Sequence, residues 1–295
     1  MANKIHILLF YKYVNIDNPE KFMKKHLDNC NELGLKGRIL VSEEGINGSV
    51  AGTIEQTEAY KKMLTSDKRF EGIQFKEDIG IMIPFRKMVI KIKKELVRFG
   101  QNVSLENTGK HLTPKEFLDV YNSGEEVIIL DARNDYESKV GKFKNAITPD
   151  IKKFTEFPKV AEQLKDKKDK KIVMYCTGGI RCEKASAYMK EQGFKDVSQL
   201  SGGILTFGKE FPDTVWEGTC FVFDKRLVSN INSNSDVISN CDICDTKCDL
   251  CRNCTNPACD KMIVCCNDCK IKMMGCCSIE CLNACRKKNI IRNYN

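Results

Sequence analysis

One stretch of the chain combines the residue types that make a cysteine reactive. Residues 175–185 read YCTGGIRCEKA and follow the apolar run KIVM, which is typical of a buried strand. Cys176 therefore stands where a strand ends, and the loop after it contains Thr177, Gly178, Gly179 and Ile180. Glycine tolerates positive φ, so successive backbone N–H groups can turn inward and form a cradle for an anion. The positive end of the following helix and the charge of Arg181 favour a thiolate at Cys176.

Two interpretations of this thiol remain open. A cysteine at a buried strand end can be inert, but the glycines, the arginine and the helix start favour a reactive thiolate that reaches solvent at the mouth of a sheet. Four residues separate Cys176 from Arg181, one fewer than in the anion loop of phosphatases, and the smaller ring suits sulfur or another compact group. Cys182 follows directly. It either packs quietly or acts as a second functional thiol that resolves an oxidised Cys176 as a disulfide.

Alternating strands and helices position this loop. Over residues 110–220, the strand-like segments VIILDAR, KIVMYC and VSQL alternate with helix-like segments, of which one starts at Thr113-Pro114 and another reads EKASAYMKEQGF. This alternation predicts a parallel α/β sheet, whose reactive groups gather where strands end. Cys176 and Asp131 both stand at such ends. The polar stretch QNVSLENTGKHL before this domain is expected to be a linker.

The first hundred residues predict a different domain. Strand-like segments read IHILLFY, GRILV, a short segment after the turn EEGING, EGIQFKEDI and KMVIKIKKELV, and helical spacing covers residues 19–33 and 53–65. The order β-α-β-β-α-β is that of a ferredoxin-like unit. Residues 1–100 are therefore expected to form a ferredoxin-like, acylphosphatase-like domain.

The end of the chain is rich in cysteine. A Ser/Asn-rich linker begins near Asn230, and 13 of the 17 cysteines lie between Cys241 and Cys285. Because this segment has few large apolar residues, it needs metal or cross-links to fold. Residues 238–285 therefore predict a separate, small metal-binding module.

Eight of these cysteines pair at spacings that suit tetrahedral zinc, enough for two ions. They are Cys241, Cys244, Cys254, Cys259, Cys266, Cys269, Cys277 and Cys281. An interleaved arrangement, with Cys241, Cys244, Cys266 and Cys269 on one ion and the other four on the second, would explain how the module folds. The remaining five, Cys248, Cys251, Cys265, Cys276 and Cys285, leave the partition open. Disulfides and an iron–sulfur cluster are the alternatives.

Composition limits the class of protein. The 295 residues are 42% apolar and 30% charged, and no segment reaches the roughly 18 uninterrupted apolar residues of a membrane span. The start MANKIHILLFYKY is expected to be a strand and not a signal peptide, which indicates the cytoplasm, where cysteines stay reduced. The net charge of +8 and the basic runs Arg86–Arg98 and Lys165–Lys171 favour a nucleic-acid partner, although each run alone is more typical of a solvated face.

The motifs resemble a known family. CTGGIR, LDARNDYE (130–137) and GKFKNAITP (141–149) are similar to the active-site region of a rhodanese domain. Together with GRILVSEEGING, SGGI and the tail pattern CDIC, NCTNPAC, CCNDC and CCSIEC, they make almost the whole chain resemble the rhodanese-type tRNA uridine hydroxylases. The resemblance implies an oxidoreductase that uses molecular oxygen as co-substrate to convert the wobble uridine of tRNA to 5-hydroxyuridine. It also implies that Cys176 is essential.

The resemblance suggests roles for single residues. Cys176 would be the nucleophile or redox centre, and Gly178, Gly179 and Arg181 would shape and charge its pocket. Asp131 and Arg133 would brace the loop, unless they form only a structural ion pair. The family pattern selects the same eight tail cysteines as zinc ligands.

One mechanistic hypothesis is addition of the Cys176 thiolate to C6 of uracil, which makes C5 electron-rich toward oxygen. The sequence carries no flavin, haem or nicotinamide signature that would activate oxygen. The expected partner is the anticodon arm of tRNA, with no membrane, because a base in a loop needs little energy to leave its stack. Two rival functions stay open: a sulfurtransferase that carries a persulfide on Cys176, and a non-catalytic RNA-binding protein.

Overall fold

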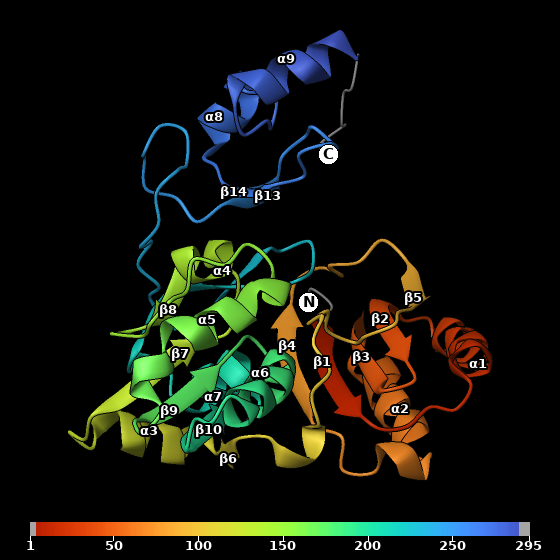
Figure 1. The fold of residues 1–295 in the computed structure, drawn as a ribbon. Helices are drawn as coiled ribbons and strands as arrows, with labels where there is room; N and C mark the ends of the chain where they lie inside the picture. The colour runs from red at the N-terminus through yellow and green to blue at the C-terminus, as the bar shows by residue number, and fades with distance from the viewer. Residues whose placement is uncertain (1–3, 289–295) are drawn as a thin grey trace.

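The computed structural model describes residues 4–288, which form three parts (Figure 1). The N-terminal part lies beside a larger α/β part, and the cysteine-rich part stands at one end of the molecule. No helix within residues 4–288 is long and apolar enough to span a membrane.

The N-terminal part is a five-stranded sheet with two helices. In chain order its elements are β1 (Ile5–Tyr13), α1 (Pro19–Glu32), β2 (Lys36–Ser42), β3 (Gly45–Gly52), α2 (Ile54–Thr65), the 3₁₀ turn η1 (Lys68–Phe70), β4 (Phe75–Gly80) and β5 (Met88–Ile92). The strand order is β4-β1-β3-β2-β5, with β5 added parallel to β2. The predicted ferredoxin-like fold is confirmed. The last strand ends at Ile92, five residues before the expected 97.

The two faces of this sheet pack against different parts of the molecule. Along β1, Leu8 and Phe10 are fully buried in the core that the sheet forms with its own helices. The alternate residues Leu9 and Tyr11 point the other way, because successive side chains of a strand face opposite sides. They lie against Gly178 and Gly179 of the cysteine loop, where an added Cβ would come within 2.9 and 2.8 Å of them. The free face of the first domain therefore covers the second domain.

The central part is a parallel α/β sheet, as predicted. Its elements are η2 (Leu105–Asn107), β6 (Lys110–Leu112), α3 (Pro114–Asn122), β7 (Val127–Asp131), α4 (Asp135–Val140), β8 (Gly141–Phe143), η3 (Phe154–Glu156), α5 (Phe157–Gln163), η4 (Lys165–Lys167), β9 (Lys171–Tyr175), α6 (Ile180–Glu191), β10 (Asp196–Leu200), α7 (Gly203–Glu210), β11 (Trp216–Phe221) and β12 (Val228–Asn230). The sheet order β6-β10-β9-β7 is parallel throughout.

Both faces of this sheet are covered by helices. On β9, Ile172 and Met174 pack into the core that includes α5 and α6, whereas Val173 and Tyr175 pack into the core that includes α3 and α7. Four strands of this part, β6, β8, β11 and β12, were not predicted from the sequence. Residues 110–112, expected to be linker, form the edge strand β6, and residues 141–143 form β8 in a small sheet ordered β12-β11-β8.

The cysteine-rich part contains two short strands and two helices: β13 (Cys251–Asn253), β14 (Met262–Val264), α8 (Asn267–Lys272) and α9 (Ile279–Lys287). Its buried clusters consist largely of cysteine side chains, and one of them includes Val140 and Phe221 of the central part. Lys139 also pairs with Asp242 across this boundary. The small apolar content supports the prediction that this part depends on its cysteines to fold.

Candidate active site

The cysteine loop has the local geometry that its sequence predicts. Strand β9 ends at Tyr175, Gly179 adopts φ 101°, and α6 begins at Ile180. The N–H of Gly179 donates a hydrogen bond to Sγ of Cys176 at 3.2 Å. The loop carbonyls point the other way, since those of Cys176 and Thr177 accept N–H bonds from the first turn of α7. The SGGI motif therefore anchors the back of the loop.

Close approach explains a glycine in that motif. Gly203 adopts φ 66°, and a Cβ there would lie 2.4 Å from the carbonyl oxygen of Cys176. No other residue type fits without moving the loop.

The surroundings of Cys176 stabilise its thiolate. Burial alone would raise the pKa, but it is outweighed by a hydrogen bond from the Cys182 thiol, the charge of Arg181 and the N–H groups of Arg181 and Cys182. Together they lower the pKa of Cys176 to about 5. Burial and the neighbouring thiolate raise the pKa of Cys182, which stays protonated and donates. The two thiols form one unit, with the charge on Cys176.

The expectation of an open thiol is wrong. Cys176 is only 1% exposed and Cys182 is fully buried. The cause is the N-terminal domain, whose strand β1 places Leu9 and Tyr11 over the loop glycines. Sequence periodicity cannot reveal this contact, because it joins segments about 170 residues apart.

Arg181 is held by a carboxylate that the sequence analysis did not single out. Its two terminal nitrogens donate to Glu137 at 2.5 and 2.7 Å, and one also contacts Thr177 Oγ1 at 3.4 Å. Glu137 is fully buried and belongs to the motif LDARNDYE. The guanidinium lends its charge to the loop but is already engaged, so it is not a free anion ligand.

Asp131 and Arg133 lie behind the loop. Arg133 is fully buried and forks onto Asp131, with Nη2 at 2.6 Å and Nε at 2.9 Å. Nη2 also donates to the carbonyl of Gly141 at 2.7 Å. The pair ties β7 to the start of β8. This geometry favours the structural interpretation, in which the ion pair braces the backbone at Gly141 and does not contact Cys176.

Polar residues of the N-terminal domain lie around Leu9 and Tyr11, the two side chains that cover the cysteine loop. Tyr11 donates its hydroxyl to Glu183 Oε1 at 2.8 Å, and the ammonium of Lys76 lies 4.5 Å from the centre of the Tyr11 ring. Burial lowers the pKa of Lys76 to about 8, although the nearby Cys176 and Glu183 oppose that shift. The hydroxyl of Tyr13 is buried and has no hydrogen-bond partner within residues 4–288. None of these residues was expected from the sequence, since their role appears only after the domains pack.

An ion cluster fastens the two domains at this point. Lys184 on α6 is 4% exposed and contacts Glu44 and Glu95 of the N-terminal domain, each at 3.0 Å. Glu44 stands in the turn of GRILVSEEGING, and Lys184 belongs to YCTGGIRCEKASA. The two motifs, far apart in sequence, therefore meet beside the cysteine loop.

A cavity of about 430 Å³ opens beside the loop, between the two domains. Leu9, Ser49 and Lys76 line it from the N-terminal sheet, and Thr177 lines it from the loop. Phe223, 60% exposed, also lines it. The Arg181 guanidinium carbon lies 5.6 Å from the centre of the Phe223 ring.

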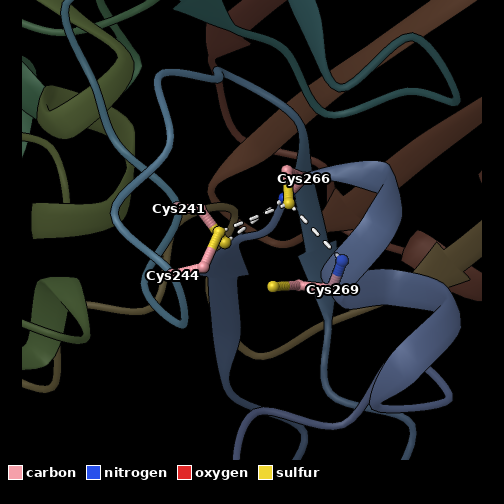
Figure 2. A group of neighbouring side chains, drawn as sticks. All are labelled: Cys241, Cys244, Cys266 and Cys269. Carbon is pink, nitrogen blue, oxygen red and sulfur yellow. Dashed lines mark hydrogen bonds between the residues drawn. The ribbon is translucent and has the colours of Figure 1, made fainter.

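The eight tail cysteines gather into two groups that could each hold a metal ion. Cys241, Cys244, Cys266 and Cys269 form the first, shown in Figure 2, and Cys254, Cys259, Cys277 and Cys281 form the second. Within each group the sulfurs lie within 4.8 Å of one another. The grouping is the interleaved one considered from the sequence.

The geometry of the sulfurs fits zinc. A tetrahedral site with metal–sulfur bonds of about 2.3 Å has sulfur–sulfur edges of about 3.8 Å. The contacts Cys244–Cys266, Cys259–Cys277 and Cys277–Cys281 each measure 3.7 Å. Backbone N–H groups also point at the sulfurs of Cys241 and Cys254, each at 3.4 Å. None of the 17 cysteines forms a disulfide in the structure.

The five further tail cysteines lie outside both groups and are buried. Cys248, Cys251 and Cys265 pack in one apolar cluster, and Cys276 and Cys285 in the other, with their sulfurs 3.7 Å apart. They act as small apolar side chains. Their packing favours the interleaved partition of the other eight.

The basic run Lys165–Lys171 forms local ion pairs. Lys165, Lys170 and Lys171 pair with Glu162, Glu126 and Glu125, respectively. Lys171 starts β9, so it stands at the opposite end of the strand from Cys176. The structure therefore favours the solvated face as the interpretation of this run.

A parallel sheet that ends in a glycine-rich cysteine loop, set between a ferredoxin-like domain and a cysteine-rich tail, defines a protein built around a rhodanese-like domain. Family models match in the same order: the UPF0176 acylphosphatase like domain over residues 5–96, the Rhodanese-like domain over 113–210 and the Rhodanase C-terminal model over 217–282. The crystal structure of a rhodanese-like domain protein from Staphylococcus aureus is 25% identical, covers 33% of this chain and 90% of that chain, and has a TM-score of 0.29.

Relatives match over nearly the full length. The tRNA uridine(34) hydroxylase of Bacillus licheniformis is 47% identical over 288 residues, which cover 95% of this chain and 89% of that protein. The protein of that name from Streptococcus pyogenes serotype M6 is 44% identical over 293 residues, with the same coverage. The chain belongs to the tRNA uridine(34) hydroxylase family, so the predicted resemblance is confirmed.

Proposed function

We propose that the protein is an oxidoreductase that hydroxylates C5 of the wobble uridine of tRNA, with molecular oxygen as the oxidant and Cys176 as the nucleophile. The observation that carries the proposal is a thiolate held in the rhodanese loop of a chain 47% identical to a protein named tRNA uridine(34) hydroxylase. An enzyme that needs a charged sulfur at neutral pH gains it from this loop.

The chemistry begins with the thiolate. Cys176 adds to C6 of uracil, the sulfur–carbon bond forms, and the electron pair of the C5–C6 double bond moves toward C5 and O4. The electron-rich C5 then takes one atom of dioxygen. The other atom leaves as water, with two electrons and two protons from an external reductant. Loss of the C5 proton and of the thiolate restores the ring as 5-hydroxyuridine.

Each residue of the loop has a part in this proposal. Thr177, Gly178, Gly179 and Ile180 form the cradle, and Arg181, held by Glu137, keeps the sulfur charged. Asp131 and Arg133 hold the strand behind it. Cys182 donates a hydrogen bond to the thiolate. It is also the second functional thiol, which could resolve an oxidised Cys176 as a disulfide. Because Cys176 is covered, the N-terminal face has to move or the base has to enter through the neighbouring cavity.

The substrate in this proposal is the anticodon arm of tRNA in the cytoplasm. A base in the anticodon loop is unpaired, so leaving its stack costs little. The net charge of +8 suits a polyanion, and phosphate contacts should dominate affinity. We assign residues 1–100 and 238–285 to holding the tRNA and residues 110–220 to the reaction.

The tail is proposed to hold two structural zinc ions, one in each cysteine group. Cys241, Cys244, Cys266 and Cys269 would hold the first, and the other four cysteines the second. Zinc would stabilise a module that buries little apolar surface. No step of the reaction requires these ions.

The experiment is mass spectrometry of tRNA nucleosides from a strain that lacks the gene, complemented with wild type or Cys176→Ala. Loss of nucleosides derived from 5-hydroxyuridine, restored by wild type alone, supports the proposal. Unchanged nucleosides together with strong thiosulfate:cyanide sulfur transfer by the purified protein would point to a sulfurtransferase. Full complementation by Cys176→Ala would leave only a binding function.

A further inference from the structure

Lys76 is a buried cation that the mechanism above does not use. It lies on β4, is 9% exposed, and lines the cavity beside the cysteine loop. Its ammonium contacts the ring of Tyr11 but makes no hydrogen bond or ion pair with a side chain in residues 4–288. No carboxylate of the described residues lies within ion-pair distance of this ammonium, although Glu183 and Cys176 are near enough to favour its charge, and placing a charge in such a poorly solvated position is costly. Such a group is a candidate for function, and its lowered pKa is in line with this.

The register of the sheet directs Lys76 toward the loop. Lys76 pairs with Leu9 of β1, so the two side chains share one face. Leu9 is the residue that lies against Gly178. The thiolate of Cys176 and the ammonium of Lys76 are close enough to act on each other electrostatically. Lys76 therefore lies on the sheet face that packs against the loop, and it lines the cavity together with Thr177, the neighbour of Cys176.

The cavity has the features of a site for a single base. Its volume of about 430 Å³ falls in the range of roughly 300–1,000 Å³ that is common for small-molecule sites. Phe223 offers an exposed aromatic ring, the kind of surface on which proteins stack unpaired bases. Thr177 connects the cavity to the loop. The lining thus includes an aromatic ring, a cation and the neighbour of the reactive sulfur.

We propose that this cavity holds the uracil ring of the wobble nucleotide and that Lys76 is a catalytic residue whose ammonium contacts O4. The inference rests on the proposed function and adds a residue and a binding site to it. When the Cys176 sulfur bonds to C6, the displaced electron pair becomes a negative charge on O4. The ammonium of Lys76 stabilises that charge by direct electrostatic contact. The cation–π contact with Tyr11 keeps the ammonium in place.

This step can be observed without oxygen. The adduct can take a proton from solvent at C5, then lose the original C5 proton and expel the thiolate. No electron is gained or lost, because the sulfur–carbon bond that forms also breaks. In heavy water the wobble uridine gains one deuterium at C5. The rate of this exchange measures the addition and the stabilisation of its product.

The test is C5 deuterium exchange in a synthetic anticodon stem–loop under argon, measured by mass spectrometry of nucleosides. The proteins are wild type, Lys76→Met, Lys76→Arg and the control Lys171→Met, at the far end of β9. Methionine keeps the apolar stem of Lys76 and removes only its ammonium group. Losing one such charge-stabilising donor costs about 10²–10³-fold in rate. We expect that loss for Lys76→Met, partial recovery for Lys76→Arg, and no change for Lys171→Met.

Alkylation of Cys176, measured on its peptide, separates the proposed role from a structural one. Exchange lost with alkylation unchanged supports the proposal. Exchange within about threefold of wild type in Lys76→Met overturns it, and so does a parallel loss of exchange and alkylation, which would make Lys76 a support of the thiolate. Wild-type protein that hydroxylates in air but never exchanges also overturns it and leaves the proposed function standing. Wild type that neither exchanges nor hydroxylates refutes the proposed function itself.

Discussion

Replacing Glu137 by glutamine should destabilise the central domain strongly while keeping its shape. The Arg181–Glu137 pair is buried, with side chains 8% and 0% exposed and two charge-assisted bonds. Removing one member of a buried ion pair leaves the other charge unpaired, which costs about 3–5 kcal/mol. Glutamine keeps one acceptor oxygen for the guanidinium, so we expect the lower end, about 3 kcal/mol.

Unfolding in urea, followed by fluorescence, measures this loss. The chain has a single tryptophan, Trp216, which is 2% exposed and belongs to the central domain. The matched control is Glu125→Gln, which removes an exposed partner of Lys171 in the same domain and should leave the transition unchanged. A loss for Glu137→Gln below about 1 kcal/mol, the value typical of exposed pairs, would refute the account of the pair as buried and essential for stability.

Two further predictions concern the sulfurs. The pKa of about 5 means that the Cys176 thiolate is fully formed above about pH 6 and is lost as pH falls through 5. Its alkylation rate should therefore be flat from pH 6.5 to 8, whereas an ordinary thiol, with a pKa of about 8.5, gains about tenfold per pH unit in that range; the latter profile would contradict the proposed anion cradle. Elemental analysis of the purified protein should find two zinc ions per chain, Cys241→Ser should remove one of them, and chelation should unfold the tail while Trp216 stays buried; a metal-free tail that remains folded would contradict the zinc assignment.

Local chemistry explains what the sequence predicts well. A strand, a pair of glycines and a helix start lie within eleven residues, so the backbone path around Cys176 follows from neighbouring residues alone. The ferredoxin-like order follows in the same way from periodicity, and the cysteine spacings suggest the two groups. Short strands such as β6 are not predicted, because three residues are too few to show a hydrophobic periodicity.

Tertiary contacts account for what the sequence does not predict. Glu137 is one acidic residue among 40, and only the fold brings it to Arg181. The cover over Cys176 and the position of Lys76 arise from the packing of one domain on another. The prediction of an open thiol was wrong because the sequence of the central domain does not show that the N-terminal domain packs over Cys176.

The central claim is that Cys176 directs an oxygen atom from dioxygen to C5 of the wobble uridine. Its most direct test is growth of the complemented deletion strain under ¹⁸O₂, with mass spectrometry of tRNA nucleosides. The account predicts heavy oxygen in 5-hydroxyuridine and its derivatives with the wild-type gene, and none of these nucleosides with Cys176→Ala. Oxygen that derives from water, or unchanged nucleosides in Cys176→Ala, would contradict it.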